Sequence, residues 1–542
     1  MRRSARLIAI GVAALTALAL TACSGGEVRG VRSGDTSSAL PASGKVREST
    51  FVYVQNLEVV TEWDPAVSYS NEIIAMQNIY ESLTIYNPVT RKAGPRLATS
   101  WTASPDSKTW TFTLRSGAKF HSGRVVDSSA VKSSIERTMR LGAAPSYIWD
   151  SVDTITTPDA NTVVFNLKYP EALDMMASAS YAAYIYDTEA AKNEDLGKWF
   201  AQGNDAGSGP YRVAKWQKGK EAELRLTAFE EYWGGWEGLK YKNIEFRVVQ
   251  EHNTAWQLLQ RGEATFIGRL TPQLFDRAAD VGGIRTMQVP SFQTMLMLFN
   301  SASGPMQDIR VRKAVQKAID YPGVIRALKG AGAPASGLVP ESMLGYKKGQ
   351  EPVEDLAGAQ ELLTQAGYGP GRELRLTLTY AAGDDDQRVL ATLLTSMLAR
   401  VNITLDARAM SWEAQWGLGK SKDTGKRQDI FVMYWWPDVA NPYSWFVNLV
   451  HSGDPVNFNL TYIKNAQLDE KIQKLPALTA TNRRAAQDAY EDLQHEVIEE
   501  RALMAVPWVV NYQRAYAGGV RHYTDNPAYP NVVFVHSVSP SA

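Results

Sequence analysis

Alternating apolar and polar residues identify a strand near residue 110. Trp110, Phe112 and Leu114 are apolar, and the residues between them are threonines. A period of two residues puts the apolar side chains on one face, so this segment is predicted to be a half-buried strand. Alternation or short apolar runs predict further strands at 51–54, 83–86, 163–167, 224–226, 244–248, 295–300, 374–379, 403–407 and 430–433.

A helical period follows the strand near residue 110. Val131, Ile135 and Met139 share one helix face, and Asp127 or Ser128 is expected to cap the helix. Similar patterns predict helices at 71–80, 171–180, 255–259, 308–320, 356–366, 389–401 and 483–500, whereas 517–534 lacks helical periodicity. Strands and helices alternate in the second half of the chain, which favours an α/β fold.

Length and charge limit the possible classes of protein. A chain of 542 residues is too long for one ordinary core and allows roughly three to four domains. The 57 Lys and Arg residues equal the 57 Asp and Glu residues, so neither nucleic acid nor an anionic membrane surface is indicated as a partner. Arg310 and Arg312 are expected on the solvated face of the helix at 308–320.

The N-terminus has the layout of a bacterial secretion signal. Arg2, Arg3 and Arg6 precede an apolar run at 7–20, which is too short to span a membrane as a lone helix. Residues 20–23, Leu-Thr-Ala-Cys, resemble the bacterial lipobox, in which the cysteine is lipidated and begins the mature chain. The paired arginines leave general and twin-arginine export both open.

Cys23 is the chain's one cysteine, so an internal disulfide or a cysteine-ligated metal is excluded. Loss of the first 22 residues removes three arginines and no acid, which leaves 54 basic against 57 acidic residues and a net charge of −3. Residues 24–49 are rich in Ser, Gly and charge and are predicted to be a flexible tether. The folded part is expected to begin near Phe51.

Motifs of catalysis are absent from the sequence. None of the six histidines falls in HExxH, and neither a P-loop nor a GxSxG elbow occurs. Residues 129–132 read SxxK, but the Lys-Thr-Gly companion of the acyl-serine enzymes is missing. The prediction is therefore a protein that is not an enzyme, with no cofactor and no metal.

The segment after the strand at 430–433 is the candidate binding site. Pro437 and Pro442 force the backbone out of regular structure, so the polar and aromatic residues around them are displayed on a loop. The candidates there are Tyr434, Trp435, Trp436, Asp438 and Asn441. Alternatively, Asp438 only holds the loop as an Asx-turn.

Two further tryptophans, Trp412 and Trp416, are close to this loop in sequence. Aromatic faces of this kind suit peptide side chains and sugar rings equally, and each tryptophan could instead belong to the core.

Several motifs occur together in a fixed order. Residues 97–101 read Leu-Ala-Thr-Ser-Trp, 104–106 Ser-Pro-Asp, 110–115 Trp-Thr-Phe-Thr-Leu-Arg and 117–123 Gly-Ala-Lys-Phe-His-Ser-Gly. Gly-Ser-Gly-Pro-Tyr at 207–211, Tyr-Trp-Gly-Gly at 232–235 and the charged helix at 308–320 follow. This succession closely resembles the extracellular solute-binding proteins, family 5, of peptide and nickel ATP-binding-cassette importers; Phe229 and Glu230 depart from its common pattern.

The resemblance implies a fold of the periplasmic-binding-protein type, with two α/β lobes, a hinge and an extra domain on the first lobe. The expected division is signal peptide 1–22, lipidated tether 23–49, first lobe 50–88, extra domain 89–204, first lobe again 205–289, second lobe 290–507 and a C-terminal return to the first lobe at 508–542.

The resemblance also implies a function. The protein is expected to be a monomeric receptor, lipid-anchored to the outer face of the cell membrane, which captures a short peptide and delivers it to membrane permease subunits. Asp438 would pair with the peptide's α-ammonium group, and Asn56, Glu58 and Trp63 follow a strand whose end usually faces the ligand. An oligosaccharide receptor and a peptide-sensing signalling receptor remain alternatives.

Overall fold

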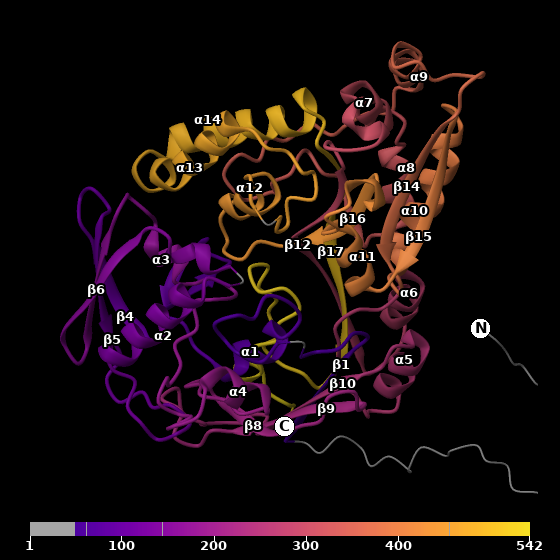
Figure 1. Ribbon diagram of the computed structural model, residues 1–542. Helices are drawn as coiled ribbons and strands as arrows, with labels where there is room; N and C mark the ends of the chain where they lie inside the picture. The colour runs from indigo at the N-terminus through magenta and orange to yellow at the C-terminus, as the bar shows by residue number, and fades with distance from the viewer. Residues whose placement is uncertain (1–48, 61, 144, 455, 542) are drawn as a thin grey trace, which may run out of the picture. The chain divides into compact units, whose positions relative to one another are not determined.

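The computed structural model describes residues 49–541 except 61, 144 and 455. These residues form an eleven-stranded sheet in the order β15-β14-β16-β12-β17-β11-β1-β10-β9-β8, with β13 paired to β17 (Figure 1). Its strands are β1 (Thr50–Gln55), β8 (Tyr211–Trp216), β9 (Ala222–Ala228), β10 (Asn243–Val248), β11 (Phe266–Ile267), β12 (Ile284–Phe299), β13 (Gly332–Ala333), β14 (Leu374–Ala381), β15 (Ile403–Met410), β16 (Ile430–Trp435) and β17 (Met504–Ala517).

The two ends of this sheet form two lobes. In the first lobe β1 lies parallel to both β10 and β11, and in the second lobe β14 lies parallel to both β15 and β16. The helices are α1 (Ile73–Ile79), α4 (Leu196–Ala201), α5 (His252–Gln260), α6 (Pro272–Ala279), α7 (Ile309–Lys317), α8 (Tyr321–Ala327), α9 (Leu356–Gln365), α10 (Asp385–Ala399), α11 (Trp412–Gly419), α12 (Tyr443–Leu449), α13 (Ala466–Thr481) and α14 (Arg483–His495), with short turns η2 (Pro305–Gln307), η3 (Thr424–Lys426), η4 (Glu496–Glu500) and η5 (Val535–Ser537). Parallel pairing requires such helical crossovers.

The long strands β12 and β17 belong to both lobes. They pair with each other from Ile284 to Leu298, while β12 also pairs with β16 and β17 also pairs with β11. Their register shifts between Pro290 and Thr294, where a proline is tolerated because the ladder is already interrupted. The two strands therefore form the connection about which the lobes can move. The sequence pattern predicted only 295–300 of β12 and did not predict β17.

A second sheet, in the order β4-β5-β7-β6, lies beside the first lobe. It comprises β4 (Ala98–Ala103), β5 (Thr109–Leu114), β6 (Val152–Asp159) and β7 (Thr162–Leu167), with α2 (Ser128–Leu141), η1 (Ser146–Trp149) and α3 (Leu173–Met176); a hairpin of β2 (Thr84–Asn87) and β3 (Lys92–Pro95) adjoins it. Trp110, Phe112 and Leu114 are buried, as predicted, and the Asp127 side chain caps α2 through the Ala130 amide. The helix expected at 171–180 is only the short α3.

The predicted position of Arg312 on a solvated helix face is wrong. Its side chain is buried, and its guanidinium donates hydrogen bonds to the carbonyl oxygens of Met306, Gln307, Arg501 and Ala502. The cation thus satisfies backbone acceptors where the chain leaves regular structure. Only Arg310 lies on the solvated face that was predicted for both.

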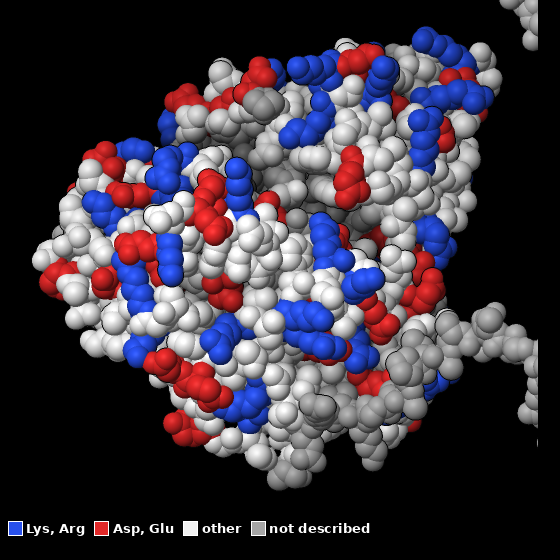
Figure 2. Space-filling view, turned by 60° about the horizontal axis from the view of Figure 1, so that its bottom comes forward, with Lys and Arg blue, Asp and Glu red and all other residues white. Residues whose placement is uncertain are grey.

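Basic and acidic side chains are interspersed on the face shown in Figure 2, as the balanced composition indicates. Among the described residues, no helix is long and apolar enough to cross a membrane.

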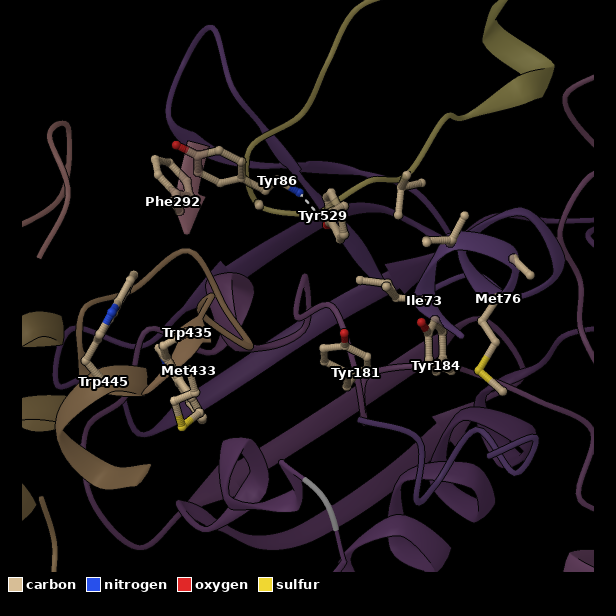
Figure 3. Packing of buried hydrophobic residues seen from close by; sticks show 14 of the residues in the cluster. Ile73, Met76, Tyr86, Tyr181, Tyr184, Phe292, Met433, Trp435, Trp445 and Tyr529 are labelled. Carbon is tan, nitrogen blue, oxygen red and sulfur yellow. Dashed lines mark hydrogen bonds between the residues drawn. The ribbon is translucent and has the colours of Figure 1, made fainter. Parts of the chain in front are cut away.

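The largest core cluster draws residues from distant parts of the chain (Figure 3). Met433, Trp435 and Trp445 lie in one part of it, and Tyr181 and Tyr184 in another. Burying side chains of this size contributes roughly 1.5–3 kcal/mol each to folding.

The C-terminal segment also enters this cluster. The Tyr529 hydroxyl donates a hydrogen bond to the Ser178 carbonyl and accepts one from the Tyr86 amide, so the end of the chain is tied to the first lobe (Figure 3).

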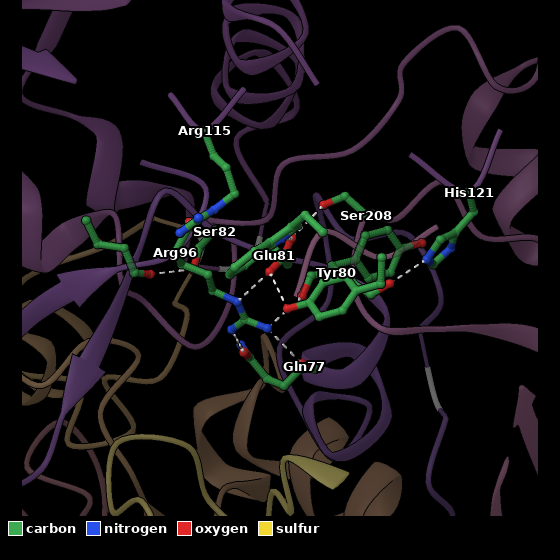
Figure 4. A network of polar contacts seen from close by, with 12 residues as sticks. Gln77, Tyr80, Glu81, Ser82, Arg96, Arg115, His121 and Ser208 are labelled. Atoms are coloured by element: carbon green, nitrogen blue, oxygen red, sulfur yellow. Dashed lines mark hydrogen bonds and ion pairs between the residues drawn. The ribbon is translucent and has the colours of Figure 1, made fainter. Parts of the chain in front are cut away.

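A buried polar network surrounds Glu81 at the end of α1 (Figure 4). Arg96 Nε lies 3.4 Å from Glu81 Oε1, and Arg96 also donates to Gln77. Tyr232 and Trp233 donate to Glu81 from a distant segment. The carboxylate therefore joins the first lobe to the hairpin that leads into the extra sheet.

Replacing Arg96 with Met should lower the free energy of unfolding by about 3 kcal/mol, because Glu81 then remains buried without its cation. Urea unfolding at pH 7, followed by tryptophan fluorescence, measures the loss. The matched control is Lys132→Met, which breaks an exposed pair with Glu136 at 3.7 Å and should cost less than about 0.5 kcal/mol. Equal effects of the two variants would contradict the role of the network.

Candidate functional site

A cavity of about 400 Å³ lies between the two lobes. The first lobe contributes the segment after β1, with Leu57 and Tyr69, and the second lobe contributes the end of β16 and the start of α11, with Trp435 and Trp412. The crossing strand β17 supplies Tyr512 and its neighbours. A ligand in this cavity would contact both lobes and the strands that connect them.

Asp438 is the most distinctive group in the cavity lining. It is 8% exposed, and its Oδ2 accepts hydrogen bonds from Tyr147 Oη at 2.8 Å, Asn448 Nδ2 at 3.1 Å and Ser444 Oγ at 3.2 Å. All three donors are neutral, and no cationic side chain of the described residues pairs with this carboxylate. Burial raises the pKa of Asp438 to about 6, against the opposing effect of these donors.

The loop that carries Asp438 is held by local and distant contacts. Asn441 Oδ1 accepts from the Tyr443 amide at 3.0 Å and from Tyr490 Oη at 3.1 Å, and α12 begins directly afterwards. The Ser180 amide donates to the Asp438 carbonyl at 2.6 Å. The carboxylate is therefore fixed partly by the extra domain, through Tyr147 and Ser180. The segment after residue 433 was predicted to be a displayed loop. In the structure, Tyr434 and Trp435 are the last residues of β16, and residues from Tyr443 onward are helical.

Aromatic side chains form much of the remaining wall. Trp435 is 6% exposed and packs against Phe458, and its Nε1 has no hydrogen-bond partner among the described residues. Trp436 donates through Nε1 to Tyr181 Oη at 3.2 Å. Trp412 is 38% exposed and stacks on Trp416 with ring centroids 5.4 Å apart.

An ion-pair cluster crosses the cavity from one lobe to the other. Arg269, just after β11, lies 3.1 Å from Asp384 through Nη1 and also pairs with Asp386, at the start of α10. Arg269 Nη2 donates to Tyr434 Oη at 3.1 Å, and that hydroxyl donates to Asp384 Oδ1 at 3.2 Å. This cluster stabilises the approach of the two lobes.

Arg514 of β17 also lines the cavity. It is buried, donates to the Gly268 carbonyl at 2.7 Å and to Asn531 Oδ1 at 2.6 Å, and pairs with Asp525 at 3.3 Å. Its charge is therefore neutralised within the protein.

Seven of the ten predicted binding residues line this cavity. They are Asn56, Glu58, Trp412, Tyr434, Trp435, Trp436 and Asp438. Three do not line it. Trp63 is a core residue that stacks on Trp216 and donates to the Asn204 carbonyl, Trp416 supports Trp412, and Asn441 holds the loop.

Sequence reasoning missed Arg269, Asp384, Asp386 and the cavity-lining part of β17. The run of three aspartates at 384–386, which four residues separate from the strand predicted at 374–379, was an available signal, because aspartates are common at the start of a helix. Arg269 and Arg514 carried no local signal. The described residues contain no cluster of His, Cys, Asp and Glu suited to a metal ion.

Two α/β lobes joined by crossing strands, with a lined cavity between them, define a solute-binding protein of the periplasmic type. Residues 92–457 match the family model for bacterial extracellular solute-binding proteins, family 5 (middle region), and the chain belongs to this family. The fold class and the family predicted from sequence are confirmed.

Known relatives agree with this membership. The chain is 27% identical over 489 residues to the probable D,D-dipeptide-binding periplasmic protein of Escherichia coli (strain K12), covering 88% of this chain and 92% of the relative. The ABC transporter-associated periplasmic binding protein of Helicobacter pylori, solved with the peptide STSA, has a TM-score of 0.78 at 21% identity and covers 91% of this chain and 98% of its own. NikZ from Campylobacter jejuni, solved with Ni(L-His), has a TM-score of 0.80 at 18% identity, covering 91% and 100%. At such identities, the two structures show the shared fold alone.

The raised pKa of Asp438 predicts how stability depends on pH. Its pKa of about 6 in the folded chain exceeds the ordinary 3.8, so folding takes up a proton between about pH 4 and 6. The wild type should therefore lose about 3 kcal/mol as the pH rises through this window. The stability of Asp438→Asn relative to the wild type should therefore increase as the pH rises from 4.5 to 8.

Unfolding temperatures of the ligand-free variants at pH 4.5, 6 and 8 measure this trend. A loss of stability that the new amide causes equally at every pH leaves this trend unchanged. Asp276→Asn, at an exposed position of α6, is the control and should show no such trend. A difference between Asp438→Asn and wild type that is the same at all three pH values would contradict the effect of burial.

Proposed function

We propose that this chain is the extracytoplasmic receptor of an ATP-binding-cassette importer, and that it captures a short peptide between its lobes and delivers it to a membrane permease. The observation that carries the proposal is Asp438, a buried carboxylate in the cavity without a cation among the described residues. Relatives whose names specify dipeptides, and a similar structure solved with a peptide, support it.

The α-ammonium group of a peptide would complete the Asp438 site. A buried anion held only by neutral donors carries an uncompensated desolvation cost, and a ligand cation offsets this cost. Such a pair fixes the ligand's orientation more than it increases affinity.

The other lining residues would hold the rest of the peptide. The unpartnered Nε1 of Trp435 is a donor for a peptide carbonyl, while Trp412 and Trp436 offer apolar faces to side chains. Asn56, Glu58 and Tyr434 are proposed to contact the ligand from the two sides of the cavity.

We also propose that the protein acts without catalysis, as a monomer that Cys23 anchors through its lipid to the outer face of the membrane. Cys23, the signal peptide and the tether up to residue 48 lie outside the described residues. The lobe boundaries predicted from sequence are part of this proposal. The register shift after Pro290 supports the predicted boundary between the first and second lobes, at residues 289 and 290.

Binding should depend on the free amine of the peptide. At about 100 times its dissociation constant, a tripeptide such as Ala-Ala-Ala should add about 2.7 kcal/mol to the folded state. Thermal unfolding of the full chain in detergent micelles, followed by tryptophan fluorescence, reports this shift. N-acetylated tripeptides, and the variant Asp438→Asn, should show little or none.

Asp276→Asn should respond to peptides as the wild type does. Stabilisation by oligosaccharides, with no response to peptides of two to five residues, would reject the peptide receptor and favour a sugar receptor. Equal stabilisation by free and acetylated peptides would reject the role of Asp438.

A further inference from the structure

Charge is unevenly distributed between the cavity and the outer surface. Both signs are interspersed on the face in Figure 2, whereas five acidic and two basic residues line the cavity. The acids are Glu58, Asp384, Asp386, Glu413 and Asp438, and the bases are Arg269 and Arg514. The cavity lining therefore carries a net negative charge.

The charges of the two arginines are already compensated within the protein, although Nη2 of Arg514 is buried without a hydrogen-bond partner among the described residues. Arg269 pairs with Asp384 and Asp386, and Arg514 pairs with Asp525. Glu58 has an exposed partner in Lys218, 3.5 Å away. The cavity acids that remain without a cationic partner among the described residues are Asp438 and Glu413.

Glu413 follows Trp412 in sequence and lies in the exposed part of the cavity lining, which we call the mouth. Trp412, Tyr69 and Leu57 are 38%, 46% and 51% exposed, although they line the same cavity. Burial, followed by the charges of Glu72, Glu62 and Glu413, raises the pKa of Tyr69. Glu413 of the second lobe and Tyr69 of the first lobe therefore both belong to the exposed part of the cavity lining.

Six residues of the cavity lining carry a buried polar atom without a hydrogen-bond partner among the described residues: Gln55, Gln415, Trp435, Tyr512, Gln513 and Arg514. Gln55 is 5% exposed and Trp435 6% exposed, and both line the cavity. Neither Gln55 Oε1 nor Trp435 Nε1 has a hydrogen-bond partner among the described residues. Buried polar atoms of this kind are normally satisfied, which indicates that a bound molecule supplies the partners.

We propose that Glu413, Trp412 and Tyr69 form a second cation subsite at the mouth, and that the preferred ligands are short peptides with a lysine or arginine side chain. A carboxylate next to aromatic faces attracts such a side chain by charge and by cation–π contact. The subsite uses both lobes, so the basic side chain also favours their closure. This inference rests on the proposed function, because it specifies the side chain of the peptide.

Calorimetric titration of the full chain in detergent micelles tests the proposal. The probes are tripeptides of alanine with one lysine at the first, second or third position, each compared with its Nε-acetyl-lysine form. At 20 mM salt, at least one lysine peptide should bind roughly 3- to 10-fold more tightly than its acetylated form. At 500 mM salt this ratio should shrink, because exposed charges are screened.

Glu413→Gln should reduce the ratio to below about 2-fold. Glu194→Gln, an equal charge change at an exposed position that does not line the cavity, should leave the ratio unchanged. If lysine and acetyl-lysine peptides bind equally to the wild type, this inference is wrong and the peptide receptor stands. If Glu413→Gln binds the lysine peptide in preference to its acetylated form as strongly as the wild type does, the proposed location of the cation subsite is wrong. If no peptide binds, the proposed function itself fails.

Discussion

The antiparallel pairing of β12 with β17 is the constraint on which the rest of the structure depends. Because each strand also pairs with a strand of one lobe, β16 or β11, the two lobes share one hydrogen-bonded sheet. Any movement of the lobes must therefore be absorbed where this ladder is irregular. The register shift after Pro290, and a second one opposite Pro507, provide such places. Cavity residues on β17, including Tyr512 and Arg514, belong to this connection.

In the proposed receptor, the position of Asp438 would link ligand binding to closure of the lobes. The loop leaves the second lobe at β16, yet two of its contacts, from Tyr147 and Ser180, come from the extra domain. Closure therefore removes the carboxylate from water, which is costly while it lacks a cation. A ligand that brings a positive charge removes part of this cost only in the closed state. Differential interaction with the two states is what shifts a conformational equilibrium.

Sequence patterns predicted the parts of this protein that depend on local periodicity. The strand containing Phe112 and the cap at Asp127 follow from neighbours in the chain, and both are present. β17 was missed because it carries Pro507 and polar residues such as Gln513, which obscure a strand pattern but line the cavity or lie at a bulge. Trp63 and Trp435 could not be distinguished from sequence, since which of them meets the cavity is decided by tertiary packing.

Electrostatics decides which charged groups remain for a ligand. The cluster of Arg269 with two aspartates spans the cavity, so it holds the two lobes together and at the same time withdraws its arginine from recognition. The charge of Arg514 is compensated by Asp525, although its Nη2 has no hydrogen-bond partner among the described residues. With both cations engaged internally, the acids without partners determine the character of the cavity. Asp438 is buried and Glu413 is exposed, so a charge placed at Asp438 gains more from the low local dielectric, whereas one at Glu413 is weakened by salt. In the proposed peptide receptor, orientation of the ligand would therefore depend chiefly on the interior carboxylate, and selectivity between side chains would depend on the mouth.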